Sequence, residues 1–422
     1  CIEESAGTDP RAVAYQAGNR VADVEVPGGG WRVREPGRGP WVPWVLPEGV
    51  LPAPVDPIHV EGWARPLATQ ENGLATVLEL IAGARHRLTV ATYMLTHPEI
   101  AEALIQAAQR GVEVRLFIEP EPIGGAPPGQ RGLVAALLQA GVGVIEARGP
   151  WSATGVQHGK VVVADGHRCL VLTENLTRSG LPDPGRRGNL GFALAIANAT
   201  LARELEARYG VHGPSHPGGI PTTWHPFAAR VGIVTAPENA WSQAVVPRLL
   251  EEADGPVWGA SLTTHPAWQD RSNPWLRALV NASDHVPVRV LLDGGGSHGP
   301  SSGTRLTLGH LARDPGAADL QVRLSGPAGK VHAKVLVTPG AVLVGSSNWN
   351  QGGALWNREV NLLVEDPSLA AWYAHALEEA FEEAGGAPEH LRVPGPSAGL
   401  VALGPCLAGW RLRRGPGLRP GS

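Results

Sequence analysis

The feature that most constrains the fold of this chain is a long internal repeat. The segment 112–120 (VEVRLFIEP) matches 286–294 (VPVRVLLDG), and 157–160 (QHGK) matches 331–334 (VHAK), both with an offset of 174 residues (286 − 112 and 331 − 157). A repeat of this length holds several helices and strands. We therefore expect two copies of one folding unit, packed on one another as a pseudo-dimer in one continuous body.

Hydrophobic periodicity predicts where the helices of each copy lie. Residues 71–84 and 238–253 have apolar residues at helical spacing after an asparagine that can cap a helix, and 199–210 and 367–381 form a matching closing helix. Each half therefore reads as helix, strand, helix, strand, the His/Lys strand, two further strands and a closing helix. Strands that alternate with helices predict an α/β fold with a mixed sheet flanked by helices.

Composition changes mark the limits of the repeat. Residues 1–65 are rich in Pro, Gly and Trp and predict an N-terminal extension of short strands and loops. We assign the first half to 66–215 and the second half to 216–385. Residues 386–422 form a Gly- and Pro-rich C-terminal tail.

The bulk composition excludes some classes of protein. The chain has 422 residues, is 43% hydrophobic and carries a net charge of −4, which argues against a protein that coats itself in nucleic-acid backbone but permits a local basic cleft. Its three cysteines, Cys1, Cys169 and Cys406, form neither a disulfide framework nor a metal site, and Cys169 lies in an apolar run typical of a buried thiol. No metal-ligand spacing is evident, so we expect no metal and no cofactor.

Both termini suggest a location, and each has two interpretations. Cys1 fits a lipoprotein cysteine left after cleavage of a signal peptide, or a fragment boundary. The 13 apolar residues 398–410, followed by Arg411, Arg413 and Arg414, are short of the roughly 20 that span a bilayer. They fit an anchoring or sorting tail, or a frayed tail. Together the ends favour an extracytoplasmic, membrane-associated protein.

The His/Lys strands carry the chemistry. Residues i and i+2 of a strand point to the same face, so His158 projects with Lys160 and His332 with Lys334. A single such histidine would be read as a core or edge residue, but the duplication disfavours that reading. If the halves pack about a pseudo-twofold axis, the two pairs face one another and form a pocket with two imidazoles and two ammonium groups.

This set of groups suits a phosphodiester. One imidazole can attack phosphorus while the other protonates the leaving oxygen and later activates water or an alcohol. The ammonium groups would stabilise charge on the non-bridging oxygens. Hydroxyl and amide donors after the next strand, Thr173 and Asn175 in one half and Ser346 and Asn348 in the other, would complete the phosphate cradle.

Further repeated features lie near these strands. Thr-His-Pro occurs at 96–98 and at 264–266, where it forms either a helix N-terminal turn or part of the cleft lining. The flexible runs 125–132 and 294–303 occupy matching places in the two halves. They are candidates for lips over the site.

The duplicated motif resembles that of the phospholipase D superfamily, in which a His-any-Lys-four residues-Asp sequence is followed by Gly-Ser-any-Asn. The first copy matches at His158, Lys160, Asp165 and Asn175, with Thr173 in place of serine, and the second at His332, Lys334, Gly345, Ser346 and Asn348. The resemblance covers roughly residues 66–385. It implies that the α/β halves form one active site in a monomer.

The resemblance also implies an activity. We expect metal-independent hydrolysis or alcohol transfer at a phosphodiester through a phosphohistidine intermediate, with a phospholipid as the favoured substrate. Two alternatives stay open: a metal-independent endonuclease of the same superfamily that acts on DNA, and an inactive surface-tethered binding module.

The first departure from the family pattern is Pro339, which stands where the second copy should have an aspartate. In the family this aspartate is mostly structural, and we assign that role to Asp165. Pro339-Gly340 supplies a turn by another route, since proline fixes φ and glycine permits positive φ. We predict little loss of activity.

The second departure concerns the support of the histidines. The family places an acid or amide where this chain has Glu359 in one half and Gly191 in the other, and this residue orients the histidine of the opposite half. Glu359 would then support His158, the expected nucleophile, and His332, the general acid and base, would have no carboxylate. Glu174 either points away from the pocket or discriminates against polyanions.

Overall fold

The computed structural model describes residues 57–384 apart from 147–154, 237–240, 269–270 and 327–328. It also describes five strands near the N-terminus, which form one sheet in chain order: β1 (Ile2–Glu4), β2 (Arg11–Gln16), β3 (Asn19–Glu25), β4 (Arg32–Arg34) and β5 (Val42–Pro43). Our interpretations of Cys1 and of the C-terminal tail lie outside the described residues.

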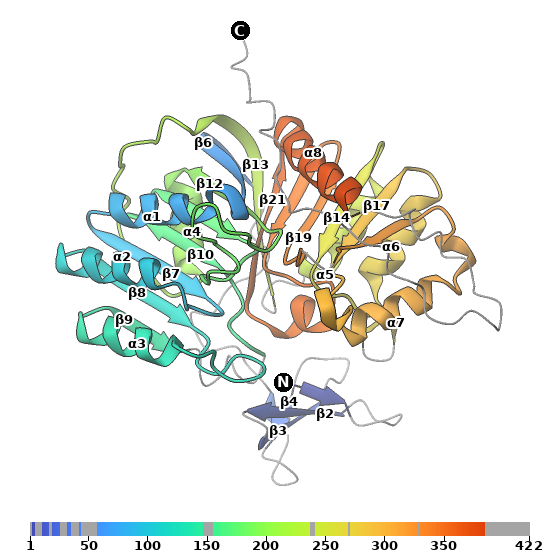
Figure 1. Ribbon diagram of the computed structural model, residues 1–422, viewed down its shortest axis with the longest axis horizontal. Coiled ribbons are helices and arrows are strands. Elements are labelled where there is room, and N and C mark those ends of the chain that lie inside the picture. Colours follow the sequence, from blue (N-terminus) through green and yellow to red (C-terminus); the bar gives the residue numbers. More distant parts are fainter. Residues whose placement is uncertain are drawn as a thin grey trace.

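A single fourteen-stranded sheet carries the body of the molecule (Figure 1). The first half contributes β6 (Ile58–Ala68), β7 (Arg87–Thr92), β8 (Glu113–Ile118), β9 (Gly143–Glu146), β10 (Val161–Ala164), β11 (Arg168–Leu172) and β12 (Phe192–Ala197). The second half contributes β13 (His225–Ala236), β14 (Val257–Ser261), β17 (Val288–Leu292), β18 (Gln321–Leu324), β19 (Lys334–Thr338), β20 (Ala341–Gly345) and β21 (Glu359–Glu365).

The order of the strands confirms the duplication. From the centre outwards, the first half runs β6-β12-β11-β10-β7-β8-β9 and the second runs β13-β21-β20-β19-β14-β17-β18, which is the same order with corresponding strands. Strands β6 and β13 pair antiparallel and join the two halves. The three outer strands of each half are parallel and the others antiparallel, so the sheet is mixed, as predicted.

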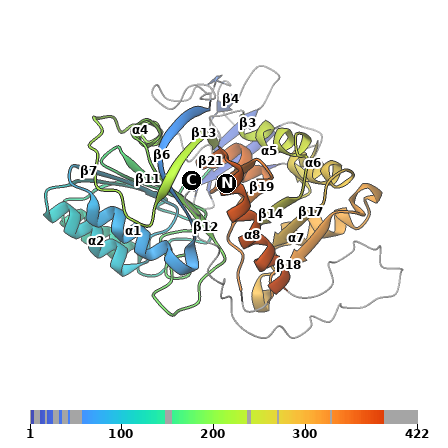
Figure 2. The ribbon, with the colours of Figure 1, turned by 90° about the horizontal axis from the view of Figure 1, so that it is seen from above.

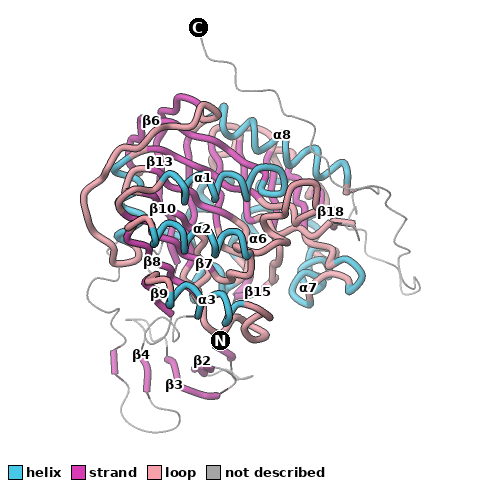
Figure 3. Tube along the Cα trace, turned by 60° about the vertical axis from the view of Figure 1, so that its left-hand side comes forward, coloured by secondary structure: helices cyan, strands magenta, loops and turns pink. Residues whose placement is uncertain are grey.

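The helices lie on the faces of this sheet. They are α1 (Leu74–Gly83), α2 (Pro98–Gln109), α3 (Gln130–Gln139), α4 (Ala199–Ala207), α5 (Trp241–Glu251), α6 (Pro274–Ser283), α7 (Ser302–Leu311) and α8 (Pro367–Glu383). Helices α1, α2 and α3 stack along one face of the first half (Figure 3). No helix in the part of the chain described here is long and apolar enough to cross a membrane.

Local sequence explains most of the helix starts, with one correction. Asn198 and Asp366 accept backbone N–H groups at the first turns of α4 and α8. The asparagine expected to cap the first helix, Asn72, does not cap it, because the π-helical turn Thr69–Gly73 precedes α1 and contains that residue. Helix α1 therefore continues a turn that already forms at the end of β6.

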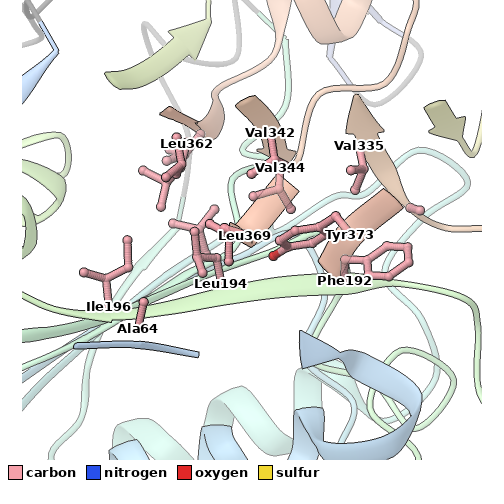
Figure 4. Packing of buried hydrophobic residues seen from close by; sticks show 14 of the residues in the cluster. Ala64, Phe192, Leu194, Ile196, Val335, Val342, Val344, Leu362, Leu369 and Tyr373 are labelled. Carbon is pink, nitrogen blue, oxygen red and sulfur yellow. The ribbon is translucent and has the colours of Figure 1, made fainter. Parts of the chain in front are cut away.

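The largest apolar core lies between the two halves. It joins inward-facing strand residues of both halves to α4 and α8, including Leu194, Val344 and Leu369 (Figure 4). Helix α8 lies at the junction (Figure 2), and Tyr373 on it donates its hydroxyl to the carbonyl oxygen of Ala193 in the first half at 2.8 Å. Two smaller cores hold α1 and α2, and α5 and α6, against the other face. The shared core fixes the His/Lys strands relative to one another.

Candidate active site

Each of the two predicted histidines is held by the backbone of the opposite half. The backbone N–H of His158 donates to the carbonyl oxygen of Arg358 at 2.9 Å, and that of His332 donates to the carbonyl oxygen of Leu190 at 2.9 Å. The accepting residues lie just before β21 and β12, the last strands of each half. The structure therefore brings both His/Lys pairs to the junction between the halves, where each needs the other half to be complete.

His158 lies against a carboxylate of the second half. Its Nδ1 atom is 2.9 Å from Oε2 of Glu359, whose other oxygen accepts from the amide of Asn357 at 3.1 Å. Both His158 and Glu359 are buried. Because its neighbour is an acceptor, Nδ1 carries the proton in the neutral ring, and Nε2 is left as the free base.

His332 also has a carboxylate, which corrects our expectation. Its Nδ1 atom lies 3.2 Å from Oε2 of Glu174 and 3.0 Å from the carbonyl oxygen of Thr173, both acceptors in the first half. The amide of Asn189 donates to the same Glu174 oxygen at 3.1 Å. The expectation that His332 lacks a carboxylate was wrong because Glu174 points into the site rather than away from it.

The two lysines are buried beside the histidines. The ammonium of Lys160 donates to the carbonyl oxygen of His158, and that of Lys334 donates to the carbonyl oxygens of His332 and Thr173. Lys334 Nζ also lies 3.0 Å from Nδ1 of His332, but its protons have these two carbonyl acceptors. Burial lowers the pKa of Lys160 to about 7, and burial and repulsion by Lys160 lower the pKa of Lys334 well below its ordinary value. An anion beside the two lysines would favour their charged forms.

Both imidazoles are neutral near pH 7. Burial lowers the pKa of His158 to about 4, against the attraction of Glu359 and with a further contribution from Lys160. Burial likewise lowers the pKa of His332 to about 3, against Glu174 and with Lys334. A neutral imidazole with a free Nε2 is the form that can act as a nucleophile or a base.

Two acids that our sequence reasoning missed anchor the histidine segments. Glu119, after β8, accepts from the backbone N–H of Gln157 at 2.9 Å, and Asp293, after β17, accepts from that of Val331 at 2.9 Å. Both acids are buried, and burial raises the pKa of each. The signal was available, because they are separated by the same 174 residues as the histidines (293 − 119).

The predicted substrate donors fall into two groups. The Thr173 hydroxyl accepts from the N–H of Phe192 at 2.9 Å, and the Ser346 hydroxyl accepts from that of Val360 at 2.9 Å, so each braces the neighbouring strand. Each hydroxyl oxygen therefore accepts a hydrogen bond from within the chain. The side chains of Asn175 and Asn348, by contrast, are buried with an amide oxygen that has no hydrogen-bond partner among the described residues.

Asp165 has structural contacts. Its carboxylate accepts the backbone N–H groups of Arg85, His86 and Arg87, and it adopts a positive φ of 57°. In the second half a turn forms at 339–340, and the Pro339 ring packs directly on Gly255, where an added Cβ would lie 2.9 Å from Cγ. The turn needs no positive φ at residue 340, contrary to our argument from glycine.

A cavity of about 630 Å³ opens beside His158. Its lining carries hydroxyl, amide and imidazole groups, with no Lys, Arg, Asp or Glu among the described residues that form it. These polar residues are Tyr93, His158, Thr263, Thr264, His265, Ser301, Ser302, Asn348, Asn350, Gln351 and Asn357. His332 does not belong to this set. The cavity is therefore a neutral hydrogen-bonding space that reaches one histidine of the pair.

The repeated Thr-His-Pro sequences have different roles in the two halves. In the first, His97 is the buried N-cap of α2 and Pro98 its first residue, as the helix-turn interpretation predicts. In the second, Thr264 and His265 line the cavity, as does the end of the run 294–303. Within the described residues, no group of three or more His, Cys, Asp or Glu side chains is placed to hold a metal ion.

Comparisons with known proteins agree with this arrangement. A family model described as "Cardiolipin synthase, PLD-like domain" matches the chain twice, over residues 77–210 and 249–381. No curated protein matches the chain significantly.

Two solved structures share the fold. Phosphatidylserine synthase of Haemophilus influenzae aligns with a TM-score of 0.55 and 14% sequence identity, over 78% of this chain and 87% of that chain. Polyphosphate kinase from Porphyromonas gingivalis aligns with a TM-score of 0.51 and 16% identity, over 75% of this chain and 50% of that chain. At these identities the likeness concerns the fold alone.

Proposed function

This chain belongs to the phospholipase D superfamily, and on that premise we propose that it cleaves a phospholipid phosphodiester through a covalent phosphohistidine intermediate. The observation that carries the proposal is the meeting of two His/Lys pairs, each with its own carboxylate, at the junction of the halves. A binding module that had lost its activity would not need both histidines, both lysines and both carboxylates together in one site.

The first step would use His158 as the nucleophile. Its Nε2 attacks phosphorus and forms a P–N bond while the P–O bond to the leaving alcohol breaks. His332, in its charged form, gives its Nε2 proton to that oxygen, so a neutral alcohol departs. An anionic phosphodiester beside His332 favours this charged form, against the burial that disfavours it in the empty site. Lys160 and Lys334 would hold the non-bridging oxygens.

The second step would reverse these roles. Water or an alcohol gives a proton to Nε2 of His332 and attacks phosphorus, the P–N bond breaks, and its electron pair returns to His158. Water yields a phosphomonoester, and an alcohol yields a new phosphodiester. One imidazole thus serves as general acid and then as general base, as microscopic reversibility requires.

The cavity supports His158 as the nucleophile. Since both histidines have a carboxylate, support by a carboxylate does not distinguish them. Their position relative to the cavity does, because His158 lines it and His332 does not. A substrate group seated in the cavity would present its phosphorus to the first-half imidazole.

The same cavity supports a phospholipid rather than a nucleic acid. A polyanionic strand requires Lys and Arg along its path, whereas the described lining of this cavity is uncharged. Hydroxyl and amide groups suit a neutral, hydroxylated headgroup such as glycerol. A quaternary ammonium would be bound less well, since a cation is usually held by a cage of Trp, Tyr or Phe rings, and Tyr93 is the only residue of these three types in the described lining.

One panel of substrates tests the proposal. The purified chain, in EDTA, is given phosphatidylglycerol vesicles, phosphatidylcholine vesicles, plasmid DNA and bis(p-nitrophenyl) phosphate. We expect release of glycerol to exceed release of choline, His158→Ala to abolish turnover, and the exposed-site control His285→Ala to retain it. Cleavage of DNA without lipid turnover would move the substrate to nucleic acid. No activity above His158→Ala on any substrate would overturn the enzyme assignment.

A further inference from the structure

We infer that Glu174 is the positioning residue of His332. It would do for His332 what Glu359 does for His158, although the two glutamates stand at positions that do not correspond in the two halves. This inference rests on the proposed function for its catalytic meaning and on geometry alone for the contact. It assigns a role to a residue that has serine, Ser347, at the matching position of the second half.

The Glu174 side chain lies in the space next to Gly191, the residue that has no side chain. Gly191 and Glu359 correspond, since each follows the residue whose carbonyl oxygen accepts from a histidine N–H of the opposite half. A Cβ added to Gly191 would lie 2.4 Å from Cγ and 2.5 Å from Oε1 of Glu174. The Glu174 side chain therefore occupies the volume into which a side chain at 191 would extend.

Corresponding asparagines donate to the two carboxylates, to the oxygen that faces the histidine in Glu174 and to the other oxygen in Glu359. Asn189 donates to Glu174 at 3.1 Å, and Asn357, its counterpart, donates to Glu359 at 3.1 Å. Burial would raise the pKa of Glu174, but His332, Lys334 and Asn189 together lower it below its ordinary value. The carboxylate is thus charged at neutral pH, as a partner for a protonated imidazole must be.

The residues that pair with these positions also differ between the halves. Thr69 pairs with Gly191, and its hydroxyl would lie 2.7 Å from a Cβ at that position. The counterpart that pairs with Glu359 is Ala236, which has no hydroxyl. The larger residue at 69 and the glutamate at 174 together fill the space that a glutamate takes in the second half.

The first test reads the contact without any substrate. In protein labelled with ¹⁵N-histidine, we expect two downfield Nδ1–H resonances, assigned by loss in His158→Ala and in His332→Ala. Glu174→Gln should shift the His332 resonance and leave the His158 resonance in place, and the matched variant Glu359→Gln should do the reverse. If Glu174→Gln left the His332 resonance and its tautomer unchanged, the inference would be overturned.

A second variant covers the case in which Glu174→Gln fails to fold. Asn189→Ala removes the donor to Glu174 but neither the histidine nor the carboxylate. We expect it to shift the His332 resonance in the same direction. An unchanged resonance in a folded Asn189→Ala protein would contradict the proposed chain of contacts.

The second test moves the carboxylate from position 174 to position 191. Glu174→Ser should lower kcat by at least about 10²-fold, since loss of an orienting carboxylate lowers turnover by up to about 10⁴-fold in a serine-protease triad. The triple variant Thr69→Ala/Glu174→Ser/Gly191→Glu should recover most of that loss. Absence of recovery with a restored His332 resonance would count against the catalytic role. A wild type inactive on all substrates, with both resonances present, would remove the proposed function and leave the contact standing.

Discussion

Glu119 and Asp293 accept the same hydrogen bond in the two halves, since each carboxylate lies 2.9 Å from the backbone nitrogen of the residue that precedes a site histidine. Each acid follows a parallel strand, β8 or β17, that is buried on both faces over its last three residues. The buried end of a parallel strand therefore fixes the position of the backbone just before each histidine.

Removal of one of these anchors should loosen its histidine. We expect Asp293→Ala to lower the free energy of unfolding by about 1–3 kcal/mol, because it leaves the Val331 N–H buried without an acceptor. Turnover should fall as well. Asp293→Asn keeps an acceptor and should retain most of both properties. Urea unfolding and kcat, measured on the two variants together, check this, and equal losses in both would contradict the hydrogen-bond explanation.

Of the two histidines, only His158 should form a covalent phosphoryl adduct. With labelled bis(p-nitrophenyl) phosphate, whose p-nitrophenolate departs without a proton from His332, and rapid acid-free quenching, His332→Ala should accumulate phosphohistidine on His158, because attack remains while release is impaired. His158→Ala should form no adduct. Mass spectrometry of the peptide around 158 provides the measurement, and an adduct retained in His158→Ala would reverse the assignment.

Anion binding should weaken as the pH rises above about 7. Below the pKa of Lys160, about 7, its ammonium is charged in the empty site, and above it an anion must bring a proton with it. We expect the Kd for sulfate, which does not titrate in this range, to rise by up to about tenfold per pH unit above pH 7 from the Lys160 proton alone, and more steeply where Lys334 also takes up a proton. Both histidines are neutral over this range before sulfate binds, so a proton taken up by His332 beside the anion would steepen the dependence in the same direction.

Isothermal titration from pH 6 to pH 9 measures this dependence. Lys160→Met should bind sulfate weakly at pH 6 and show a shallower slope. A Kd for the unaltered protein that does not change between pH 7 and pH 9 would contradict proton-linked binding.

Filling the cavity should affect recognition and spare the fold. Ser302 is exposed and lines the cavity. We expect Ser302→Trp to raise KM for phosphatidylglycerol at least tenfold with little change in melting temperature, because a surface substitution seldom changes stability by more than about 0.5 kcal/mol. Ser302→Ala serves as the control and should behave as the unaltered chain. An unchanged KM for Ser302→Trp would place the headgroup elsewhere.

Restoring the family aspartate should gain nothing. Pro339→Asp changes a turn whose ring packs on Gly255, and in the first half the aspartate at this place contacts backbone amides. We expect kcat to change less than about twofold and stability to fall by about 0.4–1 kcal/mol as chain entropy in the unfolded state rises. Parallel kinetics and thermal unfolding check both values, and a large gain in kcat would mean that the turn had impaired the site.

The sequence was enough to predict the elements that repeat. Every strand of the mixed sheet has a partner at a matching place in the other half, so the pattern around His158 and His332 could be recognised twice. The pairing of Glu359 with His158 was also predictable, since a family rule connects these positions. Asn348 belongs to the cavity lining, whereas the substrate contacts of Asn175 stay a prediction.

The rest depended on which residues share a volume, and that information is not in the chain order. Glu174 reaches His332 because Gly191 leaves space, and only the fold brings the two residues together. Read against one another, however, the halves do hold the signal: one has Glu174 with Gly191, and the other has Ser347 with Glu359. The hydroxyls of Thr173 and Ser346 were assigned to substrate because the register of the neighbouring strand was unknown.

Each histidine contacts a carboxylate of the opposite half, and this arrangement has a consequence during synthesis. When a ribosome has completed the first half, His158 exists but Glu359, 201 positions later, does not. The nascent chain thus carries an unsupported histidine and no reactive centre until nearly all of the second half has emerged and paired across β6 and β13. On the proposed mechanism, the site is therefore complete only after both halves have folded together.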